Sequence, residues 1–348
     1  MKLTRRTLLV SGAGAMAAMA MPHVARAQNL PRNIRMVIGS TSTGGDTYQN
    51  SSIVAEALAQ KLGVNIRVDP VGTNEALSAT GRDARGTTIM LHHDQIYLSY
   101  LYGVPNIPDA FADFAIGPTL AINPGDSFLV PKNSAYQSMD DIFAAAQAGE
   151  RVRVAIQPGG VSEIGFTGMR NAARFLNPGS EANIVPVNTG SQADKNQAMW
   201  DDLADVINGS IQANEQFTQL PEDDQTAMRF VWITARQQTL EQAPEAGMGG
   251  TSRADMLKLA SPQTSVPLDA DTDFTFDKEF FLLFNKEMDQ GLAGEIDAAL
   301  GEIYAEGAIK ERQTTAFFIP NYLPQAEAEA HLTAKRDMAA AVIEQLKS

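Results

Sequence analysis

The chain has 348 residues, with 41 acidic and 27 basic side chains, a formal net charge of −14, four histidines and no cysteine. So acidic a chain is not expected to bind nucleic acid or an anionic membrane surface. The lack of cysteine excludes a thiol nucleophile, a thiolate metal site and disulfides.

The first 27 residues have the three parts of an export signal. A twin arginine, Arg5-Arg6, precedes a mildly apolar run over Leu8–Met21, and an A-x-A motif follows at Ala25–Ala27. The apolar run is short and rich in Gly and Ala, which argues against a membrane anchor. We therefore predict a twin-arginine signal peptide over residues 1–27 and a mature protein in the periplasm.

Beyond this segment, strand patterns alternate with helix patterns. Short apolar runs predict strands, and amphipathic runs with capping residues predict helices. The predicted strands are 34–39, 65–72, 87–93, 151–156, 184–187, 210–213 and 229–234, and the predicted helices are 47–63, 138–149, 193–209, 291–307 and 324–347. Strands separated by helices indicate an α/β fold with mostly parallel sheets flanked by helices.

A loop with two adjacent glycines follows the first strand and is repeated later. The stretch "GSTSTGGDTYQNS" carries Gly44-Gly45, and "IQPGGVSE" carries Gly159-Gly160, each between a strand and a helix. A similar Asn-Ile strand follows each loop, so the offset is about 115 to 118 residues. In open α/β sheets, ligands bind at the carboxyl ends of strands, where such loops lie. The repeat therefore predicts two similar lobes with a ligand cleft between them.

The residue types of these loops suit a small anion. Exposed N–H groups at a helix N-terminus attract anions, and the N–H groups of Thr43 to Gly45 are the leading candidates. Neither loop has the G-x-G-x-x-G or Gly-Lys-Ser/Thr pattern of a nucleotide site. Asp46 and Glu163 are better interpreted as first-turn carboxylates that favour the helix dipole. The alternative is a chance likeness of two loops whose glycines serve packing alone.

His92 and His93 end the strand predicted at 87–93. Neighbouring strand residues face opposite sides, so the two imidazoles cannot readily share a metal ion. We expect one histidine to face the cleft and the other to pack or be solvated. No spacing in the chain supplies a nucleophile or base oriented by a third group. We therefore expect no catalytic residue, no metal and no cofactor.

An exported, two-lobed α/β chain with paired glycine loops resembles a periplasmic solute receptor. More narrowly, it resembles the extracytoplasmic receptors of tripartite tricarboxylate transporters, the Bug family, as a divergent member. The matching motifs, in order over about residues 30 to 340, are Gly44-Gly45 before Leu62-Gly63, Val68-Asp69 with Gly72, "RGTTIML" with Gly86 and Thr88, "VPVNTG" from Val185, "INGSIQA", and "FFLLFNKEMDQGLAGEIDAAL", which resembles the family's helical return.

Several positions depart from the family pattern. The family's Asp after the glycine pair falls on Tyr48, its helix Arg falls on Ser52, and its Tyr-Lys is Val187-Asn188 here. The resemblance therefore implies the family fold, and it leaves the identity of the ligand open.

The resemblance implies a type II-like binding-protein fold with a ligand cleft. One lobe is expected over residues 30–125 plus 232–348 and the other over 126–231, with crossings near "AINPGDS" and "VWITARQ". Family members bind carboxylates through such loops, often with bridging waters. The predicted ligand-binding residues are Ser42, Thr43, Gly44, Gly45, Tyr48, His92, Gly159, Gly160, Ser162, Asn188 and Thr189. Tyr48, His92 and Asn188 are candidates for tuning specificity, or else packing or rim residues.

The predicted function is capture of a small organic carboxylate, mono- or dicarboxylate, by a monomer. The ligand would be delivered to the permease subunits of a membrane transporter. Two alternatives stay open at this point. The receptor could feed a sensory kinase, or the chain could be an exported hydrolase or lyase that uses His92 with Asp94.

Overall fold

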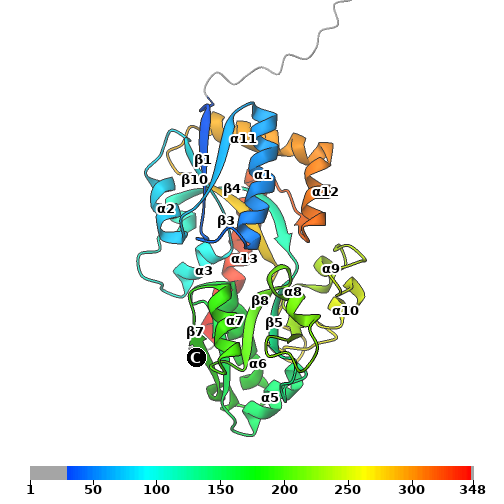
Figure 1. Ribbon diagram of the computed structural model, residues 1–348. Coiled ribbons are helices and arrows are strands. Elements are labelled where there is room, and N and C mark those ends of the chain that lie inside the picture. The colour runs from blue at the N-terminus through cyan, green and yellow to red at the C-terminus, as the bar shows by residue number, and fades with distance from the viewer. Residues whose placement is uncertain (1–29, 346–348) are drawn as a thin grey trace, which may run out of the picture.

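The computed structural model describes residues 30–345, which form two lobes, one above the other in Figure 1. The predicted signal peptide over residues 1–27 lies outside the described residues. Within residues 30–345, none of the helices combines the length and the apolar character that a membrane span requires. Each lobe has its own sheet, and helices cover both faces of each sheet (Figure 1).

The first lobe contains a six-stranded sheet with the order β2-β1-β3-β10-β4-β11. β1 pairs in parallel with β2 and β3, whereas β10 is antiparallel to β3 and β4. The strands are β1 (Asn33–Ile38), β2 (Asn65–Pro70), β3 (Thr88–His93), β4 (Phe114–Asn123), β10 (Lys278–Asn285) and β11 (Ile319–Pro320). The helices are α1 (Asp46–Leu62), α2 (Thr73–Gly81), α3 (Gln95–Leu101), α4 (Ala110–Asp113), α11 (Gln290–Glu306) and α12 (Ala308–Thr315).

The second lobe contains a five-stranded sheet with the order β7-β6-β8-β5-β9. β6 is parallel to β7 and β8, and β5 is antiparallel to β8 and β9. The strands are β5 (Asp126–Pro131), β6 (Val152–Ile156), β7 (Ile184–Asn188), β8 (Val206–Ser210) and β9 (Met228–Ile233). The helices are α5 (Met139–Gln147), α6 (Val161–Leu176), the 3-10 turn Ser180–Asn183, α7 (Gln192–Trp200), α8 (Ile211–Thr218), α9 (Gln237–Leu240) and α10 (Arg253–Leu257).

The two sheets repeat one plan. In each sheet the first parallel strand, β1 or β6, lies between the second and the third, and an antiparallel strand follows the third. That antiparallel strand, β10 or β5, is the one that the chain enters from the other lobe. The predicted repeat and the two-lobed α/β fold are therefore confirmed. The expectation of mostly parallel sheets is wrong, because at least half of the strand pairings in each sheet are antiparallel.

Two elements differ from the sequence-based expectation around residue 205. The helix predicted over 193–209 ends at Trp200, because Asp202 adopts a left-handed conformation (φ 56°) that an α-helix cannot continue. The β-branched pair Val206-Ile207 then begins β8. Of the predicted strand 210–213, only Ser210 is in β8, and the other three residues begin α8.

The segment "FFLLFN", assigned by resemblance to a helical return, is also a strand. It forms most of β10, at the middle of the first sheet, and residues 280–285 are all buried. A continuous apolar run with no polar face suits a central strand covered on both sides. The predicted helix at 291–307 begins after it, as α11.

The chain passes between the lobes at positions that the strands define. The first crossing is at 124–125, between β4 and β5, within the predicted "AINPGDS". After β9, α9 and α10 pack against the second sheet, since Leu240 and Met256 share a cluster with Ile207 and Met228. The boundary expected at 232 thus falls within β9, and the chain enters the first sheet again at Lys278.

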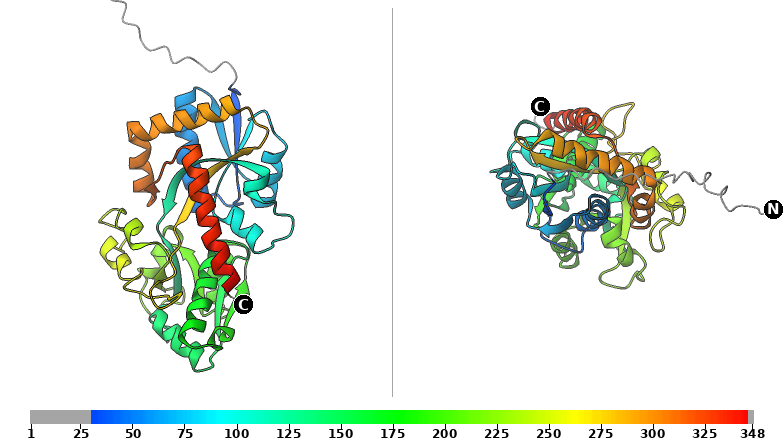
Figure 2. Two further views of the ribbon diagram at one scale, coloured as in Figure 1. Left: turned by 180° about the vertical axis from the view of Figure 1, so that it is seen from behind. Right: turned by 90° about the horizontal axis from the view of Figure 1, so that it is seen from above.

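The last helix, α13 (Gln325–Gln345), runs along both lobes, as Figure 2 shows from behind. Leu332 and Ile343 of this helix belong to an apolar cluster that includes Met90 of β3 and Val154 of β6. The helix therefore connects the cores of the two lobes.

A buried charged group holds α13 against the first lobe. The Lys335 ammonium lies 2.8 Å from Asp94 Oδ1 and 3.3 Å from Glu279 Oε2, and it also donates to the backbone carbonyl of Asp277. Burial lowers the pKa of Lys335, but the charges of Asp94 and Glu279 outweigh it and raise that pKa overall. His331, one turn earlier, places its Nε2 2.8 Å from the same Glu279 Oε2.

We predict that Lys335→Met lowers the free energy of unfolding by about 3 to 5 kcal/mol, because it leaves two buried carboxylates without their cation. Urea unfolding followed by circular dichroism would measure the change. Lys310→Met, on the exposed side of α12, is the control and should change stability by less than about 0.5 kcal/mol. A loss below about 1 kcal/mol for Lys335→Met would contradict this role.

The pair of His331 and Glu279 predicts a pH dependence. The hydrogen bond to Glu279 raises the pKa of His331 above its ordinary value of 6.5. The folded state then holds a proton that the unfolded chain releases, so the stabilisation is complete below about pH 6.5 and is lost as pH rises through the folded pKa. The stability difference between wild type and His331→Gln should be larger at pH 5.5 than at pH 8.5. An equal difference at both pH values would show that the charged form contributes nothing.

Candidate functional site

The two glycine loops lie at equivalent places in the two lobes. Gly44-Gly45 connects β1 to α1, and Gly159-Gly160 connects β6 to α6, each at the carboxyl end of a strand. Gly45 and Gly160 are the N-cap residues of their helices, and both have extended backbone conformations. The sequence therefore located both helix N-termini correctly.

The first loop is exposed and retains free donors. Its hydroxyls bond within the loop, since Ser42 Oγ accepts from the Gly44 N–H at 3.2 Å and Ser40 Oγ accepts from the Ser42 N–H at 3.0 Å. In the described part of the chain, the N–H groups of Thr43 and Gly45 donate to no acceptor. A Cβ built on Gly45 would have no atom within 4 Å, so the space in front of this helix end is open.

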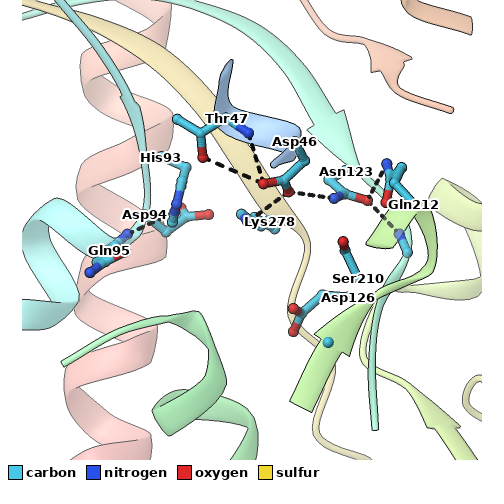
Figure 3. A network of polar contacts seen from close by, with 12 residues as sticks. Asp46, Thr47, His93, Asp94, Gln95, Asn123, Asp126, Ser210, Gln212 and Lys278 are labelled. Carbon is cyan, nitrogen blue, oxygen red and sulfur yellow. Dashed lines mark hydrogen bonds and ion pairs between the residues drawn. The ribbon is translucent and has the colours of Figure 1, made fainter. Parts of the chain in front are cut away.

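Asp46 is the first residue of α1, and both oxygens of its carboxylate accept hydrogen bonds from neighbouring residues (Figure 3). Its Oδ2 accepts from Asn123 at 2.6 Å and from Lys278 at 2.7 Å, and its Oδ1 accepts from the Thr47 N–H at 2.8 Å. Burial raises the pKa of this carboxyl, but the charge of Lys278 and these hydrogen bonds outweigh burial and hold it below the ordinary value. The interpretation of Asp46 as a first-turn residue is confirmed.

Backbone groups of the second loop are hydrogen-bonded to side chains directly after the loop and to a side chain of the first lobe. The Gly159 N–H donates to the Glu163 carboxylate, and Ser162 Oγ accepts from the Gln157 N–H at 2.8 Å. The Gly159 carbonyl accepts from Ser99 of α3 at 2.7 Å. Gly159 has φ +73°, and a Cβ there would lie 2.4 Å from the Val104 side chain, so only glycine fits. The second loop therefore forms a contact between the lobes.

Three other predicted ligand contacts, Tyr48, Asn188 and Thr189, lie outside the two loops, at the start of α1 and at the end of β7. Tyr48 lines a groove between α1 and the edge strand β2, together with Glu56 and Arg67. Asn188 is exposed at the end of β7. The Thr189 hydroxyl and N–H both donate at 2.9 Å to the Ile156 carbonyl, which joins the ends of β6 and β7.

The two histidines at the end of β3 are both buried. Neither ring nitrogen of His92 has a hydrogen-bond partner among the described residues, and the ring lies against Gly39. Burial, with the charge of Lys278, lowers the pKa of His92 to about 3, so the ring is neutral. His93 Nδ1 accepts from the Gln95 N–H at 3.3 Å. Within residues 30–345, no three His, Asp or Glu side chains are grouped as metal ligands would be.

His92 and Asp94 do not form a catalytic pair. The Asp94 carboxylate accepts from the Tyr97 hydroxyl at 2.7 Å and from the Glu279 N–H at 2.6 Å, and it also contacts Lys335. A general base needs a partner that orients it, and His92 has none in this part of the chain.

The structure adds polar residues that the sequence analysis missed. Asn123 Oδ1 accepts from the Gly125 N–H at 2.8 Å and from Gln212 of α8 at 3.1 Å, so one side chain joins Asp46 to the crossing and to the second lobe. Asp126 begins β5 on the far side of that crossing and faces this group (Figure 3). The sequence pattern that could have identified Lys278 and Asp126 is a charged residue at the start of an apolar strand, as in "KEFFLLFN" and "DSFLVP".

No protein-family model and no curated protein sequence matches this chain. Solved periplasmic binding proteins nevertheless share its fold. An R. palustris protein with adipate is 13% identical over 90% of this chain and 96% of that chain, with a TM-score of 0.70. BugD is 14% identical over 91% and 98%, with a TM-score of 0.64. MatC from Rhodopseudomonas palustris with bound malate is 15% identical over 90% and 98%, with a TM-score of 0.64. The fold is therefore that of the two-lobed periplasmic binding proteins.

We predict that Asp46 and Lys278 are energetically coupled, because their side chains are only 10% and 12% exposed and each is the other's ion partner. A double-mutant cycle of Asp46→Asn and Lys278→Met, measured by urea unfolding, should give a coupling energy of about 1 to 3 kcal/mol. The exposed pair Arg82–Glu75 is the matched control and should give less than about 1 kcal/mol. Equal coupling in the two cycles would mean that burial adds nothing to the pair.

Proposed function

We propose that this chain is an extracytoplasmic receptor that binds a small organic carboxylate between its two lobes. The observation that carries the proposal is the repeated topology, which directs two glycine-capped helix N-termini toward the boundary between the lobes. Solved proteins of the same fold hold adipate and malate, which are both small carboxylates.

The charge distribution supports the same ligand class. The chain as a whole is strongly acidic, so a carboxylate must be attracted by local donors. Free backbone N–H groups of the first loop, at the positive end of the α1 dipole, are such donors. Of the predicted contacts in this loop, Thr43 and Gly45 meet the requirement, whereas the N–H groups of Ser42 and Gly44 donate to hydroxyls within the loop.

The receptor is proposed to deliver its ligand to the permease subunits of a tripartite tricarboxylate-type transporter. Export to the periplasm by the N-terminal signal is part of the same proposal. The fold neighbours support both points, since they are periplasmic binding proteins and include a TctC solute-binding protein from Polaromonas at 14% identity and a TM-score of 0.58. We propose no catalytic role, because the neighbours are binding proteins and no described residue hydrogen-bonds to the ring of His92.

Gly45→Val tests this site without disturbing the fold. The position has an extended conformation and empty space around its Cβ, so valine fits there and should destabilise the free protein by only about 1 kcal/mol, as a poorer N-cap residue than glycine. The added methyl groups would occupy the space in front of the α1 N–H groups. In a thermal-shift screen of mono-, di- and tricarboxylates, wild type should be stabilised by about 2.7 kcal/mol at an acid concentration of 100 Kd. Gly45→Val should lose this shift.

The control is Gly294→Val, which adds the same side chain to the exposed side of α11 and should keep the full shift. Stabilisation of wild type by sugars or cations, and by no organic acid, would refute the carboxylate proposal. A full shift in Gly45→Val would show that the ligand does not contact the first loop.

A further inference from the structure

Lys195 of α7 is a buried cation with little to balance it. Lys195 is 5% exposed. Among the described residues, its ammonium donates one hydrogen bond, a long one of 3.3 Å to Asn208 Oδ1. No carboxylate of the described residues lies within 4 Å of it, whereas Lys335 and Lys278 both have a carboxylate within 2.8 Å. An ammonium can donate three hydrogen bonds, and burying one without an ion partner is costly.

Asp126, at the start of β5, is a buried anion with equally few close partners. It is 4% exposed, and its carboxylate accepts only long bonds, from Asn208 at 3.3 and 3.4 Å and from the Thr234 hydroxyl at 3.4 Å. The amide of Asn208 therefore lies between the two charges, with its oxygen toward Lys195 and its nitrogen toward Asp126. Both ends of this row have unused hydrogen-bonding capacity.

The row lies at the boundary between the lobes. Asp126 directly follows the crossing at Gly125 and faces Asp46 and Lys278 (Figure 3). Burial lowers the pKa of Lys195 to about 8, because it outweighs the opposing effect of the negative charge of Asp126. Burial also raises the pKa of Asp126 to about 6. At pH 7 the row thus holds one cation and one anion, each without a close partner.

We propose that Lys195 is the residue of the second lobe that binds the ligand's carboxylate, and that Asp126 accepts a hydrogen bond from a hydroxyl or ammonium group beside it. This inference rests on the proposed receptor function. The ligand supplies the anion that Lys195 lacks and the donor that Asp126 lacks. Because both residues are buried here, the ligand reaches them when the lobes separate around the crossing at Gly125. Carboxylates that carry a neighbouring donor are the preferred class.

Isothermal titration of the full mature chain with malate and succinate at pH 7 tests the inference. Malate carries a hydroxyl that succinate lacks, so wild type should bind malate more tightly. Lys195→Met should weaken malate binding by about 30-fold or more, as expected when one partner of a buried charge pair is removed. Asp126→Asn should keep succinate binding and lose most of the preference for malate.

Stability separates a ligand-binding lysine from a structural one. Without ligand, Lys195→Met should keep or raise the melting temperature, because it removes a poorly compensated buried charge. Lys258→Met, exposed directly after α10 in the same lobe, is the control and should change neither binding nor melting temperature. In wild type, malate affinity should fall as pH rises from 7 to 9 and Lys195 loses its proton, and Lys195→Met should lack this decline. The charged groups around Lys195 are Asp126 on β5, Lys278 on β10 and Asp46 on α1.

The failures of the two proposals are distinguishable. If wild type binds malate or succinate and Lys195→Met binds it within about threefold of wild type, the inference is overturned and the receptor function stands. A lower melting temperature for Lys195→Met with unchanged binding would assign the lysine to the fold. If wild type binds no organic acid, the receptor proposal fails, and the inference fails with it.

Discussion

The ion pair between Asp46 and Lys278 joins the parts of the chain on which the arrangement of the lobes depends. Asp46 begins α1, and Lys278 is the residue at which the chain enters the first sheet again after the second lobe. Asn123, at the end of β4, donates to the same carboxylate and accepts from Gly125 of the other crossing. Both crossings therefore converge on one buried carboxylate, which needs these donors because burial alone would favour its neutral form.

This pair also shapes the candidate site. A carboxylate of the protein already faces the N-terminal turn of α1, so the donors left for a ligand are N–H groups of the preceding loop, at Thr43 and Gly45. In the second lobe, Glu163 and Ser162 satisfy the corresponding loop, and Ser99 of α3 contacts it. The two loops are alike in sequence and differ in how many N–H groups stay free, because the side chains within and directly after each loop accept different sets of these N–H groups.

Helix α13 connects the lobes by a different kind of contact. Its apolar residues join the shared core, while Lys335 and His331 bind Asp94 and Glu279 of the first lobe. Lys335 and Lys195 are both buried, but their partners differ. The Lys335 ammonium contacts two carboxylates, whereas the Lys195 ammonium donates one long hydrogen bond to the amide of Asn208. A fully compensated buried cation suits a structural contact, and an uncompensated one suits a position that a ligand completes.

The sequence by itself determined the alternation of strands and helices, the two glycine-capped helix N-termini and the internal repeat, because apolar periodicity and capping residues are local signals. It did not reveal that "FFLLFN" forms a central strand, since a short apolar run has no period that separates a strand from a buried helix. Only the tertiary structure decided which charges meet. Lys278 and Asp46 are 232 residues apart, and Asn208 and Asp126 are 82 apart. Such contacts arise when the two sheets and their crossings pack together, and no local pattern along the chain specifies them.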